Sequence, residues 1–229
     1  MLNVRRPSWA RSLLFCLLAA TAGSAAKAQT SQNPGLDRQL SRLDIAVTAS
    51  VVLGIDSNGT AIINTVPTQV NLSPSNTVGP LVTVRYTVKP LVGFEFNYGY
   101  ARFTQNFTPF GAPPPGSSLT GGVQQNTAEY TLGYVAHFRP RHGITPFAGA
   151  GLGTLDFRPT PGGGEGLLPQ ARATYYYTVG GDYMFSEHFG ARAQFREQFY
   201  LAPDFETNYL TIHAHTTTFE PGFGFFARF

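Results

Sequence analysis

Hydrophobic and polar residues alternate along most of the chain after residue 40, with a period of two. The last segment shows this best. Phe219, Phe223 and Phe225 occupy one set of alternate positions, whereas Thr218 and Glu220 occupy the other. A helix brings residues three or four apart onto one face, but a strand turns successive side chains to opposite faces. The pattern therefore predicts β-strands.

Eight segments carry this alternation. It is weakest in residues 144–157, where Gly149, Gly151 and Gly153 fill one set of positions that we expect to face inward. The segments are residues 44–53, 82–88, 92–100, 127–138, 144–157, 172–185, 189–199 and 217–229.

The links between these segments are short and long in turn. The short ones are residues 89–90, 139–143 and 186–188, and the long ones, rich in Pro, Gly, Ser and Asn, are about 56–77, 104–124, 158–170 and 201–215. Transmembrane β-barrels have short periplasmic turns and long external loops. We predict an all-β fold, an eight-stranded antiparallel transmembrane β-barrel over residues 41–229, with both termini on the periplasmic side.

A soluble lipocalin-like barrel or a β-sandwich is the alternative, and it would turn the aromatic face inward. Alternation alone does not decide which face points out. The membrane interpretation is favoured because the strands are long enough to cross a bilayer at a tilt. Tyr and Phe also gather towards the strand ends, as in interfacial girdles.

The first 28 residues have the order of a secretory signal peptide. Basic residues precede a short apolar run at 13–20, and Ala26-Lys27-Ala28 matches a cleavage site. The apolar run is too short for a transmembrane helix. We predict cleavage after Ala28, followed by a periplasmic N-terminal lead over residues 29–40.

A lipoprotein leader acylated at Cys16 is the alternative for this segment. Phe15, just before that cysteine, is bulky, and Cys16 lies inside the apolar run, so this alternative is disfavoured. Removing the leader removes the single cysteine of the chain, and with it any disulfide or thiol chemistry.

The basic character of the chain comes from the leader. It holds four of the 16 basic residues and none of the 13 acidic ones, which leaves twelve bases against thirteen acids and a net charge of −1. A nearly neutral domain gives no electrostatic reason to expect nucleic-acid binding.

Several stretches resemble the OmpA-like family of small outer-membrane barrels, which includes opacity-type surface proteins. They are residues 145–153, 177–183, 189–196 and the closing 222–229. The resemblance implies a location in the outer membrane, with lipid and lipopolysaccharide as neighbours. It also implies a C-terminal signal for the outer-membrane assembly machinery, formed by Phe225, Ala227 and Phe229.

If the aromatic face meets lipid, acids and arginines share the interior. A balanced set would form an ion-pair core, because lone buried charges are costly, and an eight-stranded barrel is just wide enough for its own side chains to fill. A plugged, stabilising interior and a narrow ion path both remain open. The residues are Asp44, Glu95, Glu129, Asp182 and Glu220 with Arg85, Arg172, Arg192, Arg196 and Arg228.

Other candidate chemistry is weak. His213 and His215 are too few for a metal site, and Ser186 and His188 lie too close in sequence for a catalytic triad. The glycine-rich residues 162–166 lack the Lys-Ser/Thr of a phosphate loop. We expect no catalytic, cofactor or metal site, and no enzyme activity.

The function expected from the sequence is a structural or surface-interaction role, with external loops whose ligand the sequence does not indicate. The alternative is a narrow channel or carrier for ions or small solutes. A large porin is excluded, because open aqueous channels need about 16–18 strands.

Overall fold

The computed structural model describes residues 34–63, 65–109, 121–208 and 210–229. The leader and its predicted cleavage after Ala28 lie outside these residues. Two units are distinguished, one up to Arg42 and one over Leu43–Phe229. In the first, Pro34–Leu40 forms a short helix, α2, within the predicted N-terminal lead. Pro34 suits a first helical position, and Asp37 in the first turn complements the helix dipole.

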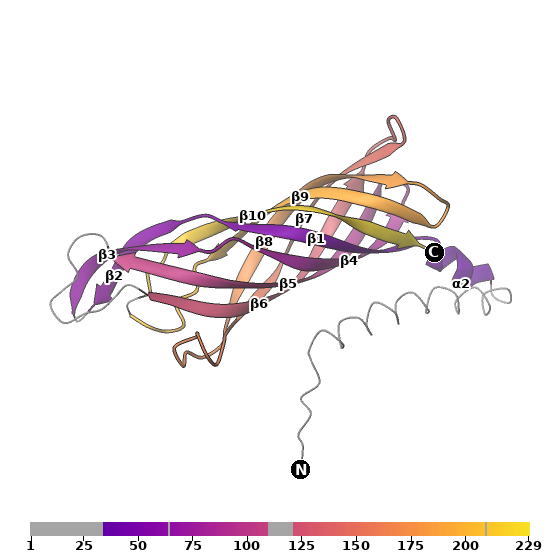
Figure 1. Cartoon of the computed structure of the whole chain (residues 1–229). Helices are drawn as coiled ribbons and strands as arrows, with labels where there is room; N and C mark the ends of the chain where they lie inside the picture. The colour runs from indigo at the N-terminus through magenta and orange to yellow at the C-terminus, as the bar shows by residue number, and fades with distance from the viewer. Residues whose placement is uncertain (1–33, 64, 110–120, 209) are drawn as a thin grey trace, which may run out of the picture. The chain divides into compact units, whose positions relative to one another are not determined.

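The second unit is a closed antiparallel β-barrel of eight strands, which confirms the predicted fold (Figure 1). Each strand pairs with the next, and β5–β6 and β1–β10 pairing completes the ring. The barrel strands are β1 (Leu43–Gly54), β4 (Thr77–Lys89), β5 (Val92–Pro109), β6 (Gly121–His137), β7 (Ile144–Pro159), β8 (Gln170–Met184), β9 (Phe189–Leu201) and β10 (His215–Arg228). Closure matters in a membrane because it leaves no unpaired edge in lipid.

Two further strands lie within the first long link. β2 (Ser57–Ile63) and β3 (Val66–Pro74) form a hairpin, and β3 continues the wall beyond β4 by pairing with the end of β5. The hairpin lies at the end of the barrel away from the C-terminus (Figure 1). The second long link is also shorter than expected, because β5 runs on to Pro109 and β6 begins at Gly121. We call this end the long-loop end, and the other the short-turn end.

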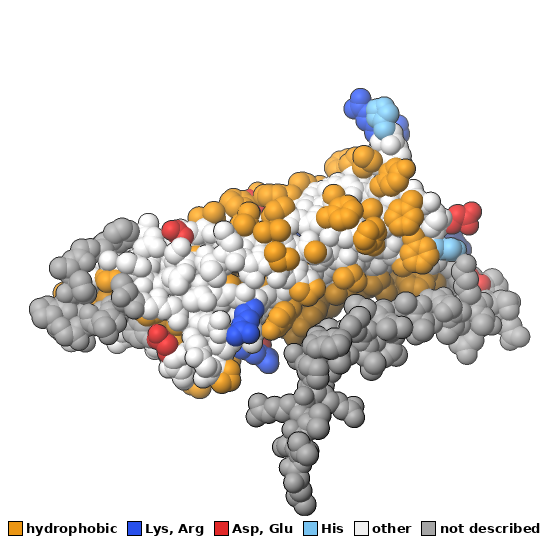
Figure 2. Space-filling view, in the orientation of Figure 1, with side chains coloured by type: hydrophobic (Ala, Val, Ile, Leu, Met, Phe, Trp, Pro, Cys, Tyr) orange, Lys and Arg blue, Asp and Glu red, His pale blue; other side chains and the backbone are white. Residues whose placement is uncertain are grey.

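The outer wall is aromatic and aliphatic over one half of the barrel. Hydrophobic side chains, mostly Tyr, Phe, Val and Leu, cover the visible wall of the half nearer the C-terminus, whereas few of them show on the visible wall towards the hairpin (Figure 2). Phe94, Leu132 and Tyr175, for example, are more than half exposed, while their neighbours along each strand turn inward. The aromatic face therefore points out. This excludes a soluble barrel with an aromatic interior.

Inward glycines make room for one large side chain. Gly149, Gly151 and Gly153 do occupy the inward positions of β7. A Cβ on Gly151 would lie 2.6 Å from the ring of Tyr176, and one on Gly133 would collide with the hydroxyl of the same tyrosine. The tyrosine ring thus lies where two strands have no side chains.

Replacing Gly133 with valine should overpack this point. We expect Gly133→Val to lower the free energy of unfolding by about 1–3 kcal/mol, measured by urea titration of the refolded protein. A methyl group at Gly162 meets nothing within 4 Å, so Gly162→Ala is the matched control. Equal stability of the two variants would contradict this packing.

Candidate functional site

Eight of the ten charged residues singled out from the sequence are buried together in the barrel lumen. Arg85 and Arg192 are 0% exposed and Arg196 is 1% exposed. The eight are Asp44, Arg85, Glu95, Glu129, Asp182, Arg192, Arg196 and Glu220.

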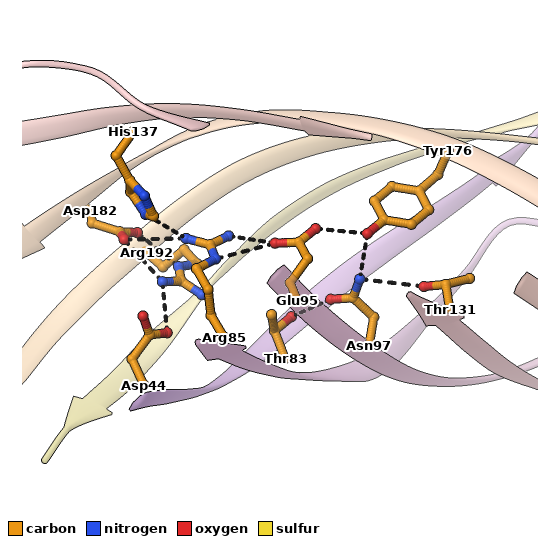
Figure 3. Close-up of polar contacts among 10 residues, drawn as sticks. All are labelled: Asp44, Thr83, Arg85, Glu95, Asn97, Thr131, His137, Tyr176, Asp182 and Arg192. Atoms are coloured by element: carbon orange, nitrogen blue, oxygen red, sulfur yellow. Dashed lines mark hydrogen bonds and ion pairs between the residues drawn. The ribbon is translucent and has the colours of Figure 1, made fainter. Parts of the chain in front are cut away.

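Five of them form what we call the Asp182 cluster (Figure 3). The cluster lies near the short-turn end, because Asp44, Asp182 and Arg192 are close to the strand ends there. Asp182 accepts from Arg192 Nε at 2.7 Å and lies 3.5 Å from Arg85 Nη1. The outer contacts are Arg85 Nη2 to Glu95 at 2.8 Å and Arg192 Nη2 to Asp44 at 3.1 Å. Each arginine thus bridges two carboxylates, and no charge in the cluster is isolated.

Aromatic rings and a histidine complete the surroundings of these arginines. The guanidinium carbon of Arg85 lies 4.3 Å from the ring centre of Phe147, and that of Arg192 lies 5.0 Å from the ring of Phe226. A cation over a ring face is attracted to its quadrupole. His137 places Nε2 3.4 Å from Arg85 Nη1, so it lines the cluster.

A line of hydrogen bonds through uncharged side chains leads away from Glu95 along the lumen (Figure 3). The Tyr176 hydroxyl donates to Glu95 Oε1 at 2.8 Å and accepts from Asn97 Nδ2 at 2.9 Å. Asn97 also bonds Thr83 and Thr131. These contacts join four strands across the interior. The inward glycines next to Tyr176 leave the space that its ring needs to make them.

The remaining three residues form the Arg196 cluster. Arg196 Nη2 donates to Glu129 Oε1 at 2.5 Å, and Nη1 donates to Glu220 Oε2 at 2.9 Å. The guanidinium carbon also lies 4.5 Å from the ring centre of Tyr176. Here one cation faces two carboxylates.

Strand register produces three of these six ion pairs. Arg85 lies directly opposite Glu95, Asp182 opposite Arg192, and Arg196 opposite Glu220 on neighbouring strands. Direct cross-strand neighbours have Cβ atoms about 4.5–5.5 Å apart, within reach of an ion pair. A register shift of one residue would turn these charges to the lipid face.

The other two predicted residues lie outside both clusters. Arg172 pairs with Asp204 at 2.8 Å at the long-loop end, and Arg228 is half-buried against Phe226. The buried set therefore holds five acids and three arginines, rather than the balanced five and five expected from the sequence. Within the Arg196 cluster the excess is one negative charge.

An apolar cap, which the alternation of residues did not predict, fills the lumen at the long-loop end. It comes from the inward ends of four barrel strands, from the β2–β3 hairpin and from residues 202–212. Its members are Ala61, Ile63, Val70, Leu72, Phe103, Phe107, Val123, Leu155, Phe157, Tyr200, Ala202, Phe205, Leu210 and Ile212. The signal was present in β5, where inward positions change from Glu95 and Asn97 to Phe103 and Phe107.

Asp204 fixes the last long link over this cap. Its carboxylate accepts from Gln170 Nε2 at 2.8 Å, from Arg172 and from the backbone of Glu206. Partial burial alone would raise the pKa of Asp204, but the hydrogen bonds from Gln170 and Glu206 and the charge of Arg172 hold the pKa below its ordinary value. The link is thus fastened by an ionised carboxylate.

The histidines and the serine considered earlier make no constellation. His213 and His215 are exposed, and the described residues contain no group of three His, Cys, Asp or Glu that could hold a metal. Ser186 Oγ accepts from the backbone of Phe189, and His188 Nδ1 contacts the Arg228 carbonyl. Within the described ranges, no helix has the length and apolar character needed to cross a membrane.

Comparison with known proteins agrees with this architecture. The chain matches the family model described as "Outer membrane protein beta-barrel domain" over residues 13–225. It resembles the outer membrane protein OprG from Pseudomonas aeruginosa, with 14% identity, a TM-score of 0.59, and coverage of 82% of this chain and 95% of OprG. Neisserial surface protein A (NspA) gives 14% identity, a TM-score of 0.52, and coverage of 81% and 97%. No curated protein sequence matches the chain.

Removing Arg196 should leave two buried carboxylates without a cation. We expect Arg196→Met to destabilise the barrel by about 3–5 kcal/mol, measured by reversible urea unfolding in detergent. Arg158→Met is the control, because the Arg158 side chain is 64% exposed on the outer wall, and it should leave stability unchanged. Similar midpoints for the two variants would show that the buried pair contributes little.

The Asp204 contacts should weaken in acid. A carboxyl whose folded pKa is depressed stabilises the fold above its unfolded value, about 3.9, and this contribution is lost as the pH falls through the folded value. Hydrogen exchange of residues 202–214 should be slower in the wild type than in Asp204→Asn at pH 6. The difference should vanish once the pH has fallen low enough to protonate Asp204 in the folded protein, and a difference that persists after protonation would refute the assignment.

Proposed function

Since the chain belongs to the outer membrane protein β-barrel domain family, we propose that it is a plugged outer-membrane anchor that presents its long-loop end to partners outside the cell. The role proposed is structural or surface-interacting, and non-enzymatic. NspA is itself named a surface protein, and at 14% identity its likeness supports the fold alone.

The filled lumen is the observation that carries this proposal. Fully buried arginines and their carboxylates occupy the middle and the short-turn end, and the apolar cap occupies the long-loop end. An eight-stranded barrel is only wide enough for side chains to fill. A hydrated ion would have to displace Phe103, Phe157 and Leu210 and then break ion pairs.

The external contact surface would be the β2–β3 hairpin and its surroundings. Its exposed polar side chains pair across the strands, with Asn71 Nδ2 2.7 Å from Asn58 Oδ1, Gln69 Nε2 3.1 Å from Thr60 Oγ1, and Ser73 Oγ 2.6 Å from Asp56 Oδ1. Such pairs hold polar groups in a fixed arrangement on a rigid extension of the wall. A rigid polar surface suits recognition by hydrogen bonds.

The neighbours proposed for the wall are outer-membrane lipid and lipopolysaccharide, because the exposed apolar band requires a lipid environment. Phe225 points outward and is 61% exposed, and Ala227 follows on the same face of β10. With Phe229, these residues remain our proposal for the signal read by the assembly machinery. We also retain cleavage after Ala28 as a proposal, to be tested by N-terminal sequencing of the outer-membrane form.

A narrow channel or carrier for ions or small solutes is the second candidate. One observation favours it, a cavity of about 40 Å³ in mid-lumen whose mixed polar and apolar lining includes Glu129 and Glu220. For conduction, this cavity would have to connect with solvent through both the cap and the Asp182 cluster.

Conductance in a planar bilayer separates the two functions. We expect the refolded wild-type protein to be silent, with an unboiled-gel mobility shift as proof of folding. Reproducible current steps that change when Arg196 is replaced by methionine would overturn the plugged anchor and establish a channel.

A further inference from the structure

The cavity in mid-lumen has a polar floor and an apolar roof, and we call it the chamber. Its volume is about 40 Å³, enough for about three water molecules, since one needs roughly 10–15 Å³ on this measure. Its floor includes Ser50, Thr127, Glu129, Gln198 and Glu220. The roof is the underside of the apolar cap, with Phe103, Leu155 and Phe157.

Counted as two carboxylates and one guanidinium, the groups at the chamber have a formal excess of one negative charge. Glu129 and Glu220 both border it, are 5% and 6% exposed, and share the single guanidinium of Arg196. The next charged group along the lumen is another acid, Glu95, reached through Tyr176. Arg85, Arg172 and Arg192 are engaged elsewhere, with Asp44, Glu95, Asp182 and Asp204. Arg228 lies against Phe226 at the short-turn end. A buried charge without a counter-charge is costly.

Oxygen atoms without protein partners border the same space. Ser50 Oγ and Thr127 Oγ1 make no hydrogen bond within the protein. Both residues are nevertheless buried, with Ser50 3% and Thr127 7% exposed. Ser50 lies on β1 and Thr127 on β6, so the two hydroxyl groups reach the chamber from different strands. Buried polar atoms in folded proteins nearly always have a partner, so these hydroxyls point to a bound species.

We propose that the chamber binds a monovalent cation, Na⁺ or K⁺, held by the carboxylates of Glu129 and Glu220, the hydroxyls of Ser50 and Thr127, and a few waters. Hard cations favour carboxylate, hydroxyl and water oxygens. A single positive charge matches the excess of two carboxylates over one guanidinium. The site lies below the cap and does not depend on what the external loops bind.

The test compares salts at one ionic strength. The protein is refolded in detergent in NaCl, in KCl or in N-methylglucamine chloride, whose cation is too large for the chamber, and thermal unfolding is followed by gel mobility. A salt at about ten times its dissociation constant should raise the unfolding temperature by about 4 °C over N-methylglucamine. An unfolding temperature independent of the cation would overturn the proposal. It would indicate that a proton on one carboxylate neutralises the excess charge.

Two variants locate the effect. Glu220→Gln leaves one carboxylate facing Arg196, so the shift should disappear, whereas Glu187→Gln, in an exposed turn at the far end, should keep it. A full shift in Glu220→Gln would place the cation elsewhere and refute the site. If Glu220→Gln does not fold, Ser50→Ala and Thr127→Val serve instead, and each should reduce the shift at least twofold. An unreduced shift in both would also refute it.

Conductance reports on the proposed function separately. A silent bilayer with a cation-dependent unfolding temperature supports both proposals. A conducting barrel with the same dependence would sink the plugged anchor and leave the cation site standing.

Discussion

Buried guanidinium groups held between carboxylates of facing strands are the interaction on which the rest of this structure depends. A barrel closed in lipid has no unpaired edge, but it encloses a lumen that must be filled. Arg85, Arg192 and Arg196 fill it, and each lies between two acids. Removing one partner leaves a buried charge without a counter-charge, which is costly. The ion pairs therefore fix the register of the β-strands that carry them.

The wall changes its polarity along its length, and the two halves have different roles. In the half nearer the C-terminus, aromatic side chains point outward and charged side chains point into the lumen. Towards the long-loop end the same strands turn polar residues outward and bury apolar ones, as Arg102 and Phe103 do in β5. In this half the residues pack as in a water-soluble β-barrel, with polar side chains outside and apolar side chains inside. The apolar cap that it contributes seals the charged lumen, which is why the surface, rather than the lumen, is the proposed working part.

Much of the fold could be predicted from sequence, because a strand with one face in lipid must alternate with a period of two. The eight strands and their three short turns follow from that rule. The β2–β3 hairpin could not be found in this way, since Asn58, Gly59 and Thr60 do not show the lipid-facing pattern. The cap was missed for a related reason. Beyond Ala101 the alternation continues with its polarity exchanged, and so it resembles a polar loop.

The interior charges were less predictable than the strands. Alternation identifies an inward residue but not its position along the barrel axis. That position decides which other charged residues it can contact. Arg172 and Arg228 have the right phase, yet they lie near opposite ends of the barrel and outside the two clusters. The excess of acids around Arg196, and the chamber beside it, therefore emerged only from the three-dimensional arrangement.

The most direct test of the ion-pair core is a double-mutant cycle between Arg196 and Glu129, measured by reversible urea unfolding of the refolded barrel. The cycle compares Arg196→Met, Glu129→Met and the double variant, so it isolates their mutual interaction from the loss of either side chain. The account predicts a coupling free energy of about 2 kcal/mol or more, with the double variant clearly more stable than the sum of the single changes implies. Additivity within about 0.5 kcal/mol would contradict it, because the two groups would then contribute to the barrel independently.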